Sequence, residues 1–170
     1  MKKYNWGIIG AGWIGGDMAQ ALLDVNGEVY GIYNRTLKKA QDFAAKYGVK
    51  HVFETQEAML ADPQVDIVYI ATPHNAHYDV MMRAIEAGKH VLCEKAITVT
   101  YQQLESAVAL AREKGVIVAE AMTMYHMPLI KKLREMVDGG VIGKVRMVQC
   151  NFGSTKPYDV DDRYFNADLA

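Results

Sequence analysis

Short apolar runs alternate with longer amphipathic segments through residues 1–121 of the chain. The apolar runs lack the polar alternation of half-exposed strands, which is typical of strands buried on both faces of a parallel sheet. They predict strands at Trp6–Gly10, Glu28–Tyr33, His51–Phe53, Ile67–Ala71, His90–Cys93 and Val116–Ala119. The amphipathic segments predict helices at Gly15–Asp24, Leu37–Tyr47, Gln56–Ala61, Tyr78–Ala87 and Tyr101–Lys114. This alternation predicts a doubly wound α/β domain with right-handed crossovers.

The pattern changes in residues 122–170. A helix is predicted at Pro128–Val137, and residues 143–153 alternate like a long strand with Arg146, Val148, Cys150 and Phe152 on one face. A single strand with two unpaired edges is not a stable unit. We therefore expect residues 122–170 to hold the linking helix and first strand of an incomplete second domain. The alternative is that this strand joins the edge of the first sheet or another subunit.

Composition and charge narrow the function classes. The chain is 51% hydrophobic and 23% charged, which is typical of a soluble globular protein. Its formal net charge is −1, so the sequence shows no excess of positive charge that would indicate binding to nucleic acid. No apolar run approaches the length of a bilayer span, so we expect no membrane partner. The lysine-rich start resembles a signal peptide, but its apolar stretch is short, contains glycines and lacks a small-residue cleavage site. Cys93 and Cys150 have no metal-type spacing, which indicates reduced thiols in a cytoplasmic protein.

Glycines gather where the first predicted strand should turn into the first helix. Gly10, Gly12 and Gly15 form G-x-G-x-x-G in the strand–turn–helix context of the dinucleotide fingerprint. There the first glycine permits a tight turn, the second lets the backbone approach a pyrophosphate, and the third lets the helix pack close to the strand. Free N–H groups of the first helical turn, at Trp13 and Ile14, would bind the phosphates. The alternative is a glycine-rich turn without a ligand.

The end of the second predicted strand bears on the choice of dinucleotide. NAD-binding folds often place an acid about 20 residues past the fingerprint, where it binds the ribose 2′-hydroxyl. This chain has Asn34, Arg35 and Thr36 there instead. An arginine can bind a 2′-phosphate that an acid would repel, so the sequence favours NADP over NAD. The alternatives are that Arg35 stacks on the adenine or faces solvent and that Thr36 only caps the next helix.

Three further segments carry a family resemblance. They are "ATPHNAH" (residues 71–77), "AGKHVLCEKA" (residues 87–96) and the stretch of residues 119–146. With the fingerprint, they resemble the Gfo/Idh/MocA family of glucose–fructose oxidoreductase and inositol dehydrogenase, and most of all its NADP-dependent dihydrodiol and D-xylose dehydrogenase branch. The resemblance implies an N-terminal Rossmann domain and an α+β second domain, incomplete here, with a mostly antiparallel sheet that carries part of the substrate site.

The resemblance also implies a set of cofactor-binding residues. Thr72 and Pro73 should line the nicotinamide side of the cleft, and Glu94 should hold the nicotinamide ribose. His74 stands where the family often has asparagine, and His77 matches the family's histidine. His74 facing solvent at a helix start is the alternative. The spacing of these two histidines also suits metal ligands, but no third ligand is near them in the sequence, so we expect no metal.

Lys95 corresponds to the lysine that contacts the substrate hydroxyl in the family, and it contacts the cofactor as well. It follows a central strand at the carboxyl edge, where ligands bind in such folds. Burial and a positive nicotinamide ring would both lower the pKa of a lysine and make it a better base. Ala96 replaces the proline that the family has after this lysine, and Arg163 resembles an arginine that reaches back towards the cofactor.

The resemblance implies a dehydrogenase that transfers a hydride between NADP or NAD and a sugar, polyol or diol. It also implies a homo-oligomer formed through the second domain. Two alternatives stay open: a glycosidase of the same family that holds NAD tightly, and a dinucleotide-binding module without catalysis. Residues 1–170 alone should be incomplete for turnover, since part of the substrate site is expected in the second domain.

Overall fold

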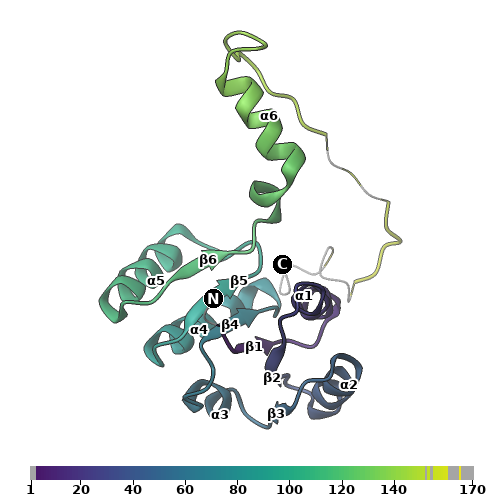
Figure 1. The fold of residues 1–170 in the computed structure, drawn as a ribbon, viewed down its shortest axis with the longest axis vertical. Helices are drawn as coiled ribbons and strands as arrows, with labels where there is room; N and C mark the ends of the chain where they lie inside the picture. The colour runs from purple at the N-terminus through teal and green to yellow at the C-terminus, as the bar shows by residue number, and fades with distance from the viewer. Residues whose placement is uncertain (1–2, 152, 154, 161–164, 166–170) are drawn as a thin grey trace.

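The computed structural model describes residues 3–151, 153, 155–160 and 165. Within these residues the chain forms a six-stranded sheet flanked by helices (Figure 1). The strands are β1 (Trp6–Ile9), β2 (Val29–Tyr33), β3 (His51–Phe53), β4 (Ile67–Ile70), β5 (His90–Cys93) and β6 (Val118–Glu120). The α-helices are α1 (Trp13–Asp24), α2 (Leu37–Tyr47), α3 (Gln56–Ala61), α4 (His74–Glu86), α5 (Tyr101–Lys114) and α6 (Pro128–Asp138), and a 3₁₀ turn, η1, spans Thr123–His126.

The strand order is β3-β2-β1-β4-β5-β6, and every strand pair is parallel. The order reverses direction between β1 and β4, so the connections that leave these two strands diverge. In an open α/β sheet, ligands bind in the crevice outside the carboxyl ends of the strands at such a switch point. The doubly wound prediction is therefore confirmed, and the topology indicates where a site should lie.

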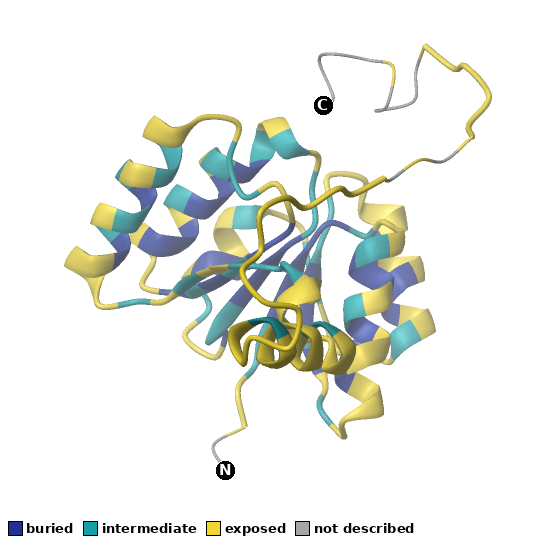
Figure 2. Ribbon diagram, turned by 90° about the horizontal axis from the view of Figure 1, so that it is seen from above, coloured by how far each residue is buried: buried dark blue, intermediate teal, exposed yellow. Residues whose placement is uncertain are grey.

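Two hydrophobic clusters cover the two faces of the sheet. One holds buried residues of α1 and α2 with Ile8, Ile32 and Tyr69 of the strands. The other holds buried residues of α3, α4 and α5 with Ile9, Ile70 and Cys93. Figure 2 shows the buried colour along the strands and on the inner side of these helices. Both faces are covered, which explains why the strands are apolar runs rather than alternating ones.

Predicted and observed elements differ mainly at their ends. The helix predicted from Tyr78 begins four residues earlier, at His74. The sequence pattern did not reveal this first turn because its residues are polar and show no apolar period, although His77 is buried. The first helix begins at Trp13, directly after the N-cap Gly12. The helix at Tyr101–Lys114 has the predicted bounds. It begins at a Thr100–Gln103 capping box and ends at Gly115, whose φ of 67° is left-handed.

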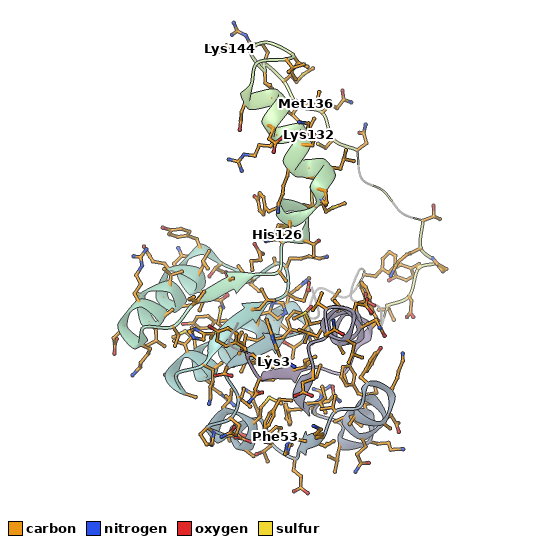
Figure 3. All side chains as sticks on the ribbon, in the orientation of Figure 1. Lys3, Phe53, His126, Lys132, Met136 and Lys144 are labelled. Atoms are coloured by element: carbon orange, nitrogen blue, oxygen red, sulfur yellow. The ribbon has the colours of Figure 1, made fainter. Side chains whose placement is uncertain are left out.

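The elements η1 and α6 project from the sheet domain. Figure 1 shows α6 standing away from the helices that flank the sheet, and Figure 3 labels His126, Lys132, Met136 and Lys144 along this arm. The strand predicted at residues 143–153 is not formed by its described residues, which are exposed and belong to no sheet. Neither the strand nor its alternative pairing with the first sheet is seen, because a strand needs a neighbour for its backbone hydrogen bonds. The division into domains at residue 121 stays a prediction.

Candidate functional site

The turn between β1 and α1 contains three glycines with different surroundings. Gly10 has a φ of 113°, and a Cβ atom there would lie 2.5 Å from the Ala71 carbonyl oxygen. A Cβ atom on Gly15 would lie 2.4 Å from the Gly10 carbonyl oxygen, so α1 could not approach the end of β1 as closely. A Cβ atom on Gly12 would meet nothing within 4 Å. Two glycines are thus required by the fold, whereas the third leaves open space beside the backbone.

Asn34 links the end of β2 to this glycine turn. Its Oδ1 accepts a hydrogen bond from the Ala11 backbone N–H at 3.1 Å, and its Nδ2 donates to the Thr36 carbonyl at 3.0 Å. Thr36 occupies the N-cap position of α2, but its side chain makes no capping hydrogen bond. The predicted N-cap position of Thr36 is therefore confirmed, but its hydroxyl does not cap the helix and remains available beside Asn34.

Arg35 and Lys39 bring positive charge to the same place. Both side chains are exposed, and neither forms an ion pair with a described residue, whereas neighbouring Lys38 bonds Asp42 at 2.6 Å. Both cations line a cavity of about 550 Å³ at the carboxyl ends of β1, β2 and β4. Asp79 of α4 also lines this cavity. The β2 side of the cavity is therefore suited to an anionic group.

The same cavity contains unsatisfied polar atoms. Thr72 Oγ1 and Gln56 Nε2 are buried and have no hydrogen-bond partner, and both residues line the cavity. Buried polar atoms without partners are rare in folded proteins and are explained where a ligand supplies the missing bond. Gly12 lines a second cavity of about 420 Å³, which shares Lys39 with the first. The two cavities together fit a polar ligand that runs from the glycine turn to the end of β2.

The segment of residues 94–97 is held by side chains from two other elements. From α4, His74 Nε2 lies 2.8 Å from the Lys95 carbonyl oxygen, and His77 Nδ1 lies 2.9 Å from that of Ala96. From β6, Glu120 Oε1 accepts the Ile97 backbone N–H at 2.9 Å. The Lys95–Ala96 peptide bond is cis. The backbone from the Lys95 carbonyl to the Ile97 N–H is thus held in place, although Ala96 stands where the resemblance predicts a proline.

His77 is fully buried, and its second nitrogen lies 2.9 Å from the Thr72 carbonyl oxygen. Both ring nitrogens therefore face carbonyls, and a neutral imidazole, with one N–H, can donate to one of them at a time. His77 connects the segments after β4 and β5, so its contribution to a ligand site would be indirect. The alternative that His74 only faces solvent is wrong here, because its ring contacts Lys95.

Lys95 and Glu94 lie at a small recess of about 30 Å³, together with Trp13, Ile14, Thr72 and His74. Six predicted site residues thus meet at one place. Lys95 itself is exposed. The described residues therefore do not provide the burial of its amine that was expected for a lysine that acts as a base. Glu94 is 8% exposed, and its Oε1 accepts from the Tyr69 hydroxyl at 2.5 Å.

Burial also acts on two neighbours of Glu94. Burial, and secondarily the negative charges of Glu94 and Glu120, raise the pKa of the Cys93 thiol to about 12. Burial raises the pKa of Tyr69 well above its usual value, and the hydrogen bond to Glu94 and its charge add to this effect. The Cys93 thiol and the Tyr69 hydroxyl therefore both stay protonated at neutral pH.

The remaining predictions have mixed outcomes. Gly10, Asn34, Arg35, Thr36, Thr72 and Pro73 share the larger cavity. Arg163 lies outside the described residues. Among the residues described, no three His, Cys, Asp or Glu side chains are grouped to hold a metal ion, and no helix is long and apolar enough to span a bilayer. Both cysteines are free.

Sequence reasoning missed three residues that the structure places at this site: Gln56, Tyr69 and Glu120. A polar residue within an apolar strand was a usable signal for Tyr69. The other two, Gln56 and Glu120, lie in ordinary helical and strand-end contexts and gave no signal.

Comparison with known proteins agrees with this geometry. Residues 4–122 match the oxidoreductase family with an NAD-binding Rossmann fold. Trans-1,2-dihydrobenzene-1,2-diol dehydrogenase of Mus musculus is 34% identical over 152 residues, which cover 88% of this chain and 46% of the relative. D-xylose 1-dehydrogenase (NADP⁺) of Hypocrea jecorina is 37% identical over 155 residues, which cover 83% of this chain and 39% of the relative.

A solved structure is similar over the same region. KijD10, a 3-ketoreductase from Actinomadura kijaniata in complex with TDP-benzene and NADP, superimposes with a TM-score of 0.77 at 35% identity. The match covers 85% of this chain and 46% of that one. The chain thus spans less than half the length of each of these three proteins.

Proposed function

This chain belongs to the oxidoreductase family with an NAD-binding Rossmann fold, and we propose that it binds NADP as part of a dehydrogenase. The proposed reaction transfers a hydride between the nicotinamide and a hydroxyl or carbonyl group of a sugar, polyol or diol. The names of the dihydrodiol and xylose dehydrogenases and of the 3-ketoreductase support this substrate class.

One observation carries the choice of NADP. Arg35 and Lys39 are cations without ion-pair partners among the described residues, and both line the cavity at the end of β2. A 2′-phosphate accepts charge-assisted hydrogen bonds from such groups, whereas an acid at this place would suit the 2′-hydroxyl of NAD. The Thr36 hydroxyl, which makes no cap, is a further donor at the same wall.

The residues present fit the rest of the cofactor. The open side of Gly12 and the first-turn N–H groups at Trp13 and Ile14 would hold the pyrophosphate. The unsatisfied Thr72 hydroxyl, Glu94 and His74 would meet the nicotinamide half, and NADP supplies the hydride chemistry when it is bound.

Lys95 is the residue we propose for proton transfer. Oxidation of a secondary alcohol releases a proton as well as a hydride, and the Lys95 amine at the recess would accept that proton. The contacts of His74, His77 and Glu120 fix the backbone around Lys95 and so limit where its side chain can reach. Desolvation that favours a neutral amine would then come from bound cofactor, substrate or a second domain.

The proposal extends to the whole protein. A second domain with a mostly antiparallel sheet is part of this proposal. The exposed stripe of Leu129, Leu133 and Met136 on α6 supports a further packing partner for this helix, but does not bear on the type of sheet. We propose that this domain completes the substrate site and forms a homo-oligomer. Two free thiols support a cytoplasmic location.

A titration with NADPH and with NADH, followed by nicotinamide fluorescence, tests the proposal. Hydrogen bonds to a charged group contribute about 1.5–3 kcal/mol, so we expect NADPH to bind roughly 10- to 150-fold more tightly than NADH. Arg35→Asp should remove that preference or reverse it. Lys38→Ala is the matched control, because Lys38 pairs with Asp42 and does not line the cavity. Equal binding of the two dinucleotides by the wild type would contradict the role of Arg35.

A further inference from the structure

Tyr69 is a polar residue in an otherwise apolar strand at the centre of the sheet. It lies in β4, between β1 and β5, and is 3% exposed. Its ring belongs to the cluster on the face covered by α1 and α2. Its hydroxyl donates to Glu94 Oε1, from one strand to the end of the next. A buried hydroxyl needs a partner, and here the partner is a residue at the proposed cofactor site.

Both oxygens of the Glu94 carboxylate are engaged by this chain. Oε1 accepts from Tyr69, and Oε2 accepts from the Lys95 backbone N–H at 3.2 Å. Two contacts on different oxygens define the plane of the carboxylate as well as its position. Because burial and the neighbouring carboxylate raise the pKa of Tyr69, its hydroxyl remains a hydrogen-bond donor at neutral pH.

The remaining hydrogen-bonding capacity of Glu94 matches a ribose. A carboxylate has about four lone-pair sites, and Tyr69 and Lys95 use two of them. Glu94 also lines the recess with Trp13, Ile14 and Thr72. Glu94 also lines a larger cavity of about 420 Å³ together with Tyr69 and Ile14. Two unused acceptor sites are the number that the two neighbouring hydroxyls of one ribose ring require.

We propose that Tyr69 is a positioning residue that holds the Glu94 carboxylate in the orientation that binds the nicotinamide ribose. This inference rests on the proposed function. Without the Tyr69 hydroxyl, the Glu94 side chain would lose one of its two fixed contacts and would have to become ordered when the cofactor binds. Ordering one flexible side chain corresponds to roughly 2- to 10-fold in affinity. Tyr69 would therefore affect the nicotinamide half of the cofactor and not the adenosine half.

A pair of ligands separates these two halves. Adenosine 2′,5′-bisphosphate carries the adenosine ribose and 2′-phosphate but no nicotinamide, whereas NADPH carries both halves. Tyr69→Phe should weaken NADPH binding roughly 2- to 10-fold and leave the dissociation constant of the bisphosphate unchanged in calorimetric titrations. In a Glu94→Ala background, Tyr69→Phe should weaken NADPH binding no further, because the coupled partner is gone.

Tyr30→Phe is the matched control. Tyr30 of β2 also donates to a carboxylate, Asp62 Oδ2, at 3.1 Å, but neither residue lines a cavity described above. The change is chemically the same, so Tyr30→Phe should leave both dissociation constants unchanged. A Tyr69→Phe variant that binds both ligands as the wild type does, or that weakens both equally, would overturn the positioning role. Wild-type protein that binds neither ligand would instead overturn the proposed function.

A second measurement covers the case in which Tyr69→Phe does not fold. With 3-fluorotyrosine installed at position 69, the ¹⁹F resonance reports the surroundings of the phenol in folded protein. The resonance should move when NADPH is added and should not move with adenosine 2′,5′-bisphosphate. A resonance that is unmoved by bound NADPH would show that Glu94 and Tyr69 do not respond to the nicotinamide half, and the inference would fail.

Discussion

Alanine at Gly12 and alanine at Gly15 should damage this protein in different ways, because the surroundings of the two positions are opposite. A Cβ atom on Gly12 meets nothing within 4 Å, whereas one on Gly15 lies 2.4 Å from the Gly10 carbonyl oxygen and 3.6 Å from Ile8 Cγ2. The first methyl group would enter the space proposed for the pyrophosphate. The second would enter the contact between α1 and the end of β1.

The expected stability changes follow from these contacts. At Gly12, φ is −81° and ψ is −178°, which alanine adopts without strain. Reduced freedom of the unfolded chain would stabilise Gly12→Ala by about 0.4–1 kcal/mol, and the poor N-cap preference of alanine would offset a similar amount. At Gly15, overpacking costs about 1–3 kcal/mol and helix propensity returns at most about 1 kcal/mol. We therefore expect almost no net change for Gly12→Ala. Because the clash at Gly15 is with a backbone oxygen, its cost should lie near the upper end, which leaves a net loss of about 2 kcal/mol for Gly15→Ala.

Urea unfolding and NADPH titration of the two variants test this reasoning. Gly12→Ala should unfold like the wild type but bind NADPH at least tenfold more weakly, a change of about 1.4 kcal/mol. Gly15→Ala should lose stability, and its binding should weaken as well because the Gly10 carbonyl must move. Wild-type NADPH affinity in Gly12→Ala would refute the path of the pyrophosphate past Gly12. Wild-type stability in Gly15→Ala would refute the close approach of α1.

Two further predictions concern buried groups. Iodoacetamide at pH 8 should alkylate exposed Cys150 and leave Cys93 unmodified until the protein is unfolded. The reason is that the raised pKa of Cys93 keeps its buried thiol protonated. Mass spectrometry of the peptides measures this, and modification of Cys93 in the folded protein would contradict it. His77→Ala should lower the free energy of unfolding by about 2–4 kcal/mol, since it opens a cavity and removes the hydrogen bond that the ring donates to the Thr72 or the Ala96 carbonyl. His51→Ala, at an exposed histidine, is the control in the same urea titration, and equal stability of the two variants would show that His77 does not hold the segment after β5.

Local sequence pattern was sufficient for the sheet domain. The bounds at Leu37–Tyr47, His51–Phe53 and Tyr101–Lys114 agree with the structure because periodicity and capping act within a few residues. The spacing of Gly10, Gly12 and Gly15 was also readable from the sequence, although the structure shows that only Gly10 and Gly15 are required by the turn itself. The family resemblance added candidate site residues that no local pattern could supply.

Contacts between distant residues were decided only by the tertiary structure. Tyr69 and Glu94 are 25 residues apart, and Glu120 and Ile97 are 23 apart, so no local period relates them. The unsatisfied amide of Gln56 has meaning only because Gln56 and Thr72, which are far apart in the sequence, line the same cavity. The same principle explains the strand predicted at residues 143–153, which its described residues do not form. Alternation of side chains is a local property, but a strand exists only where another strand supplies its hydrogen bonds, and packing between elements decides that condition.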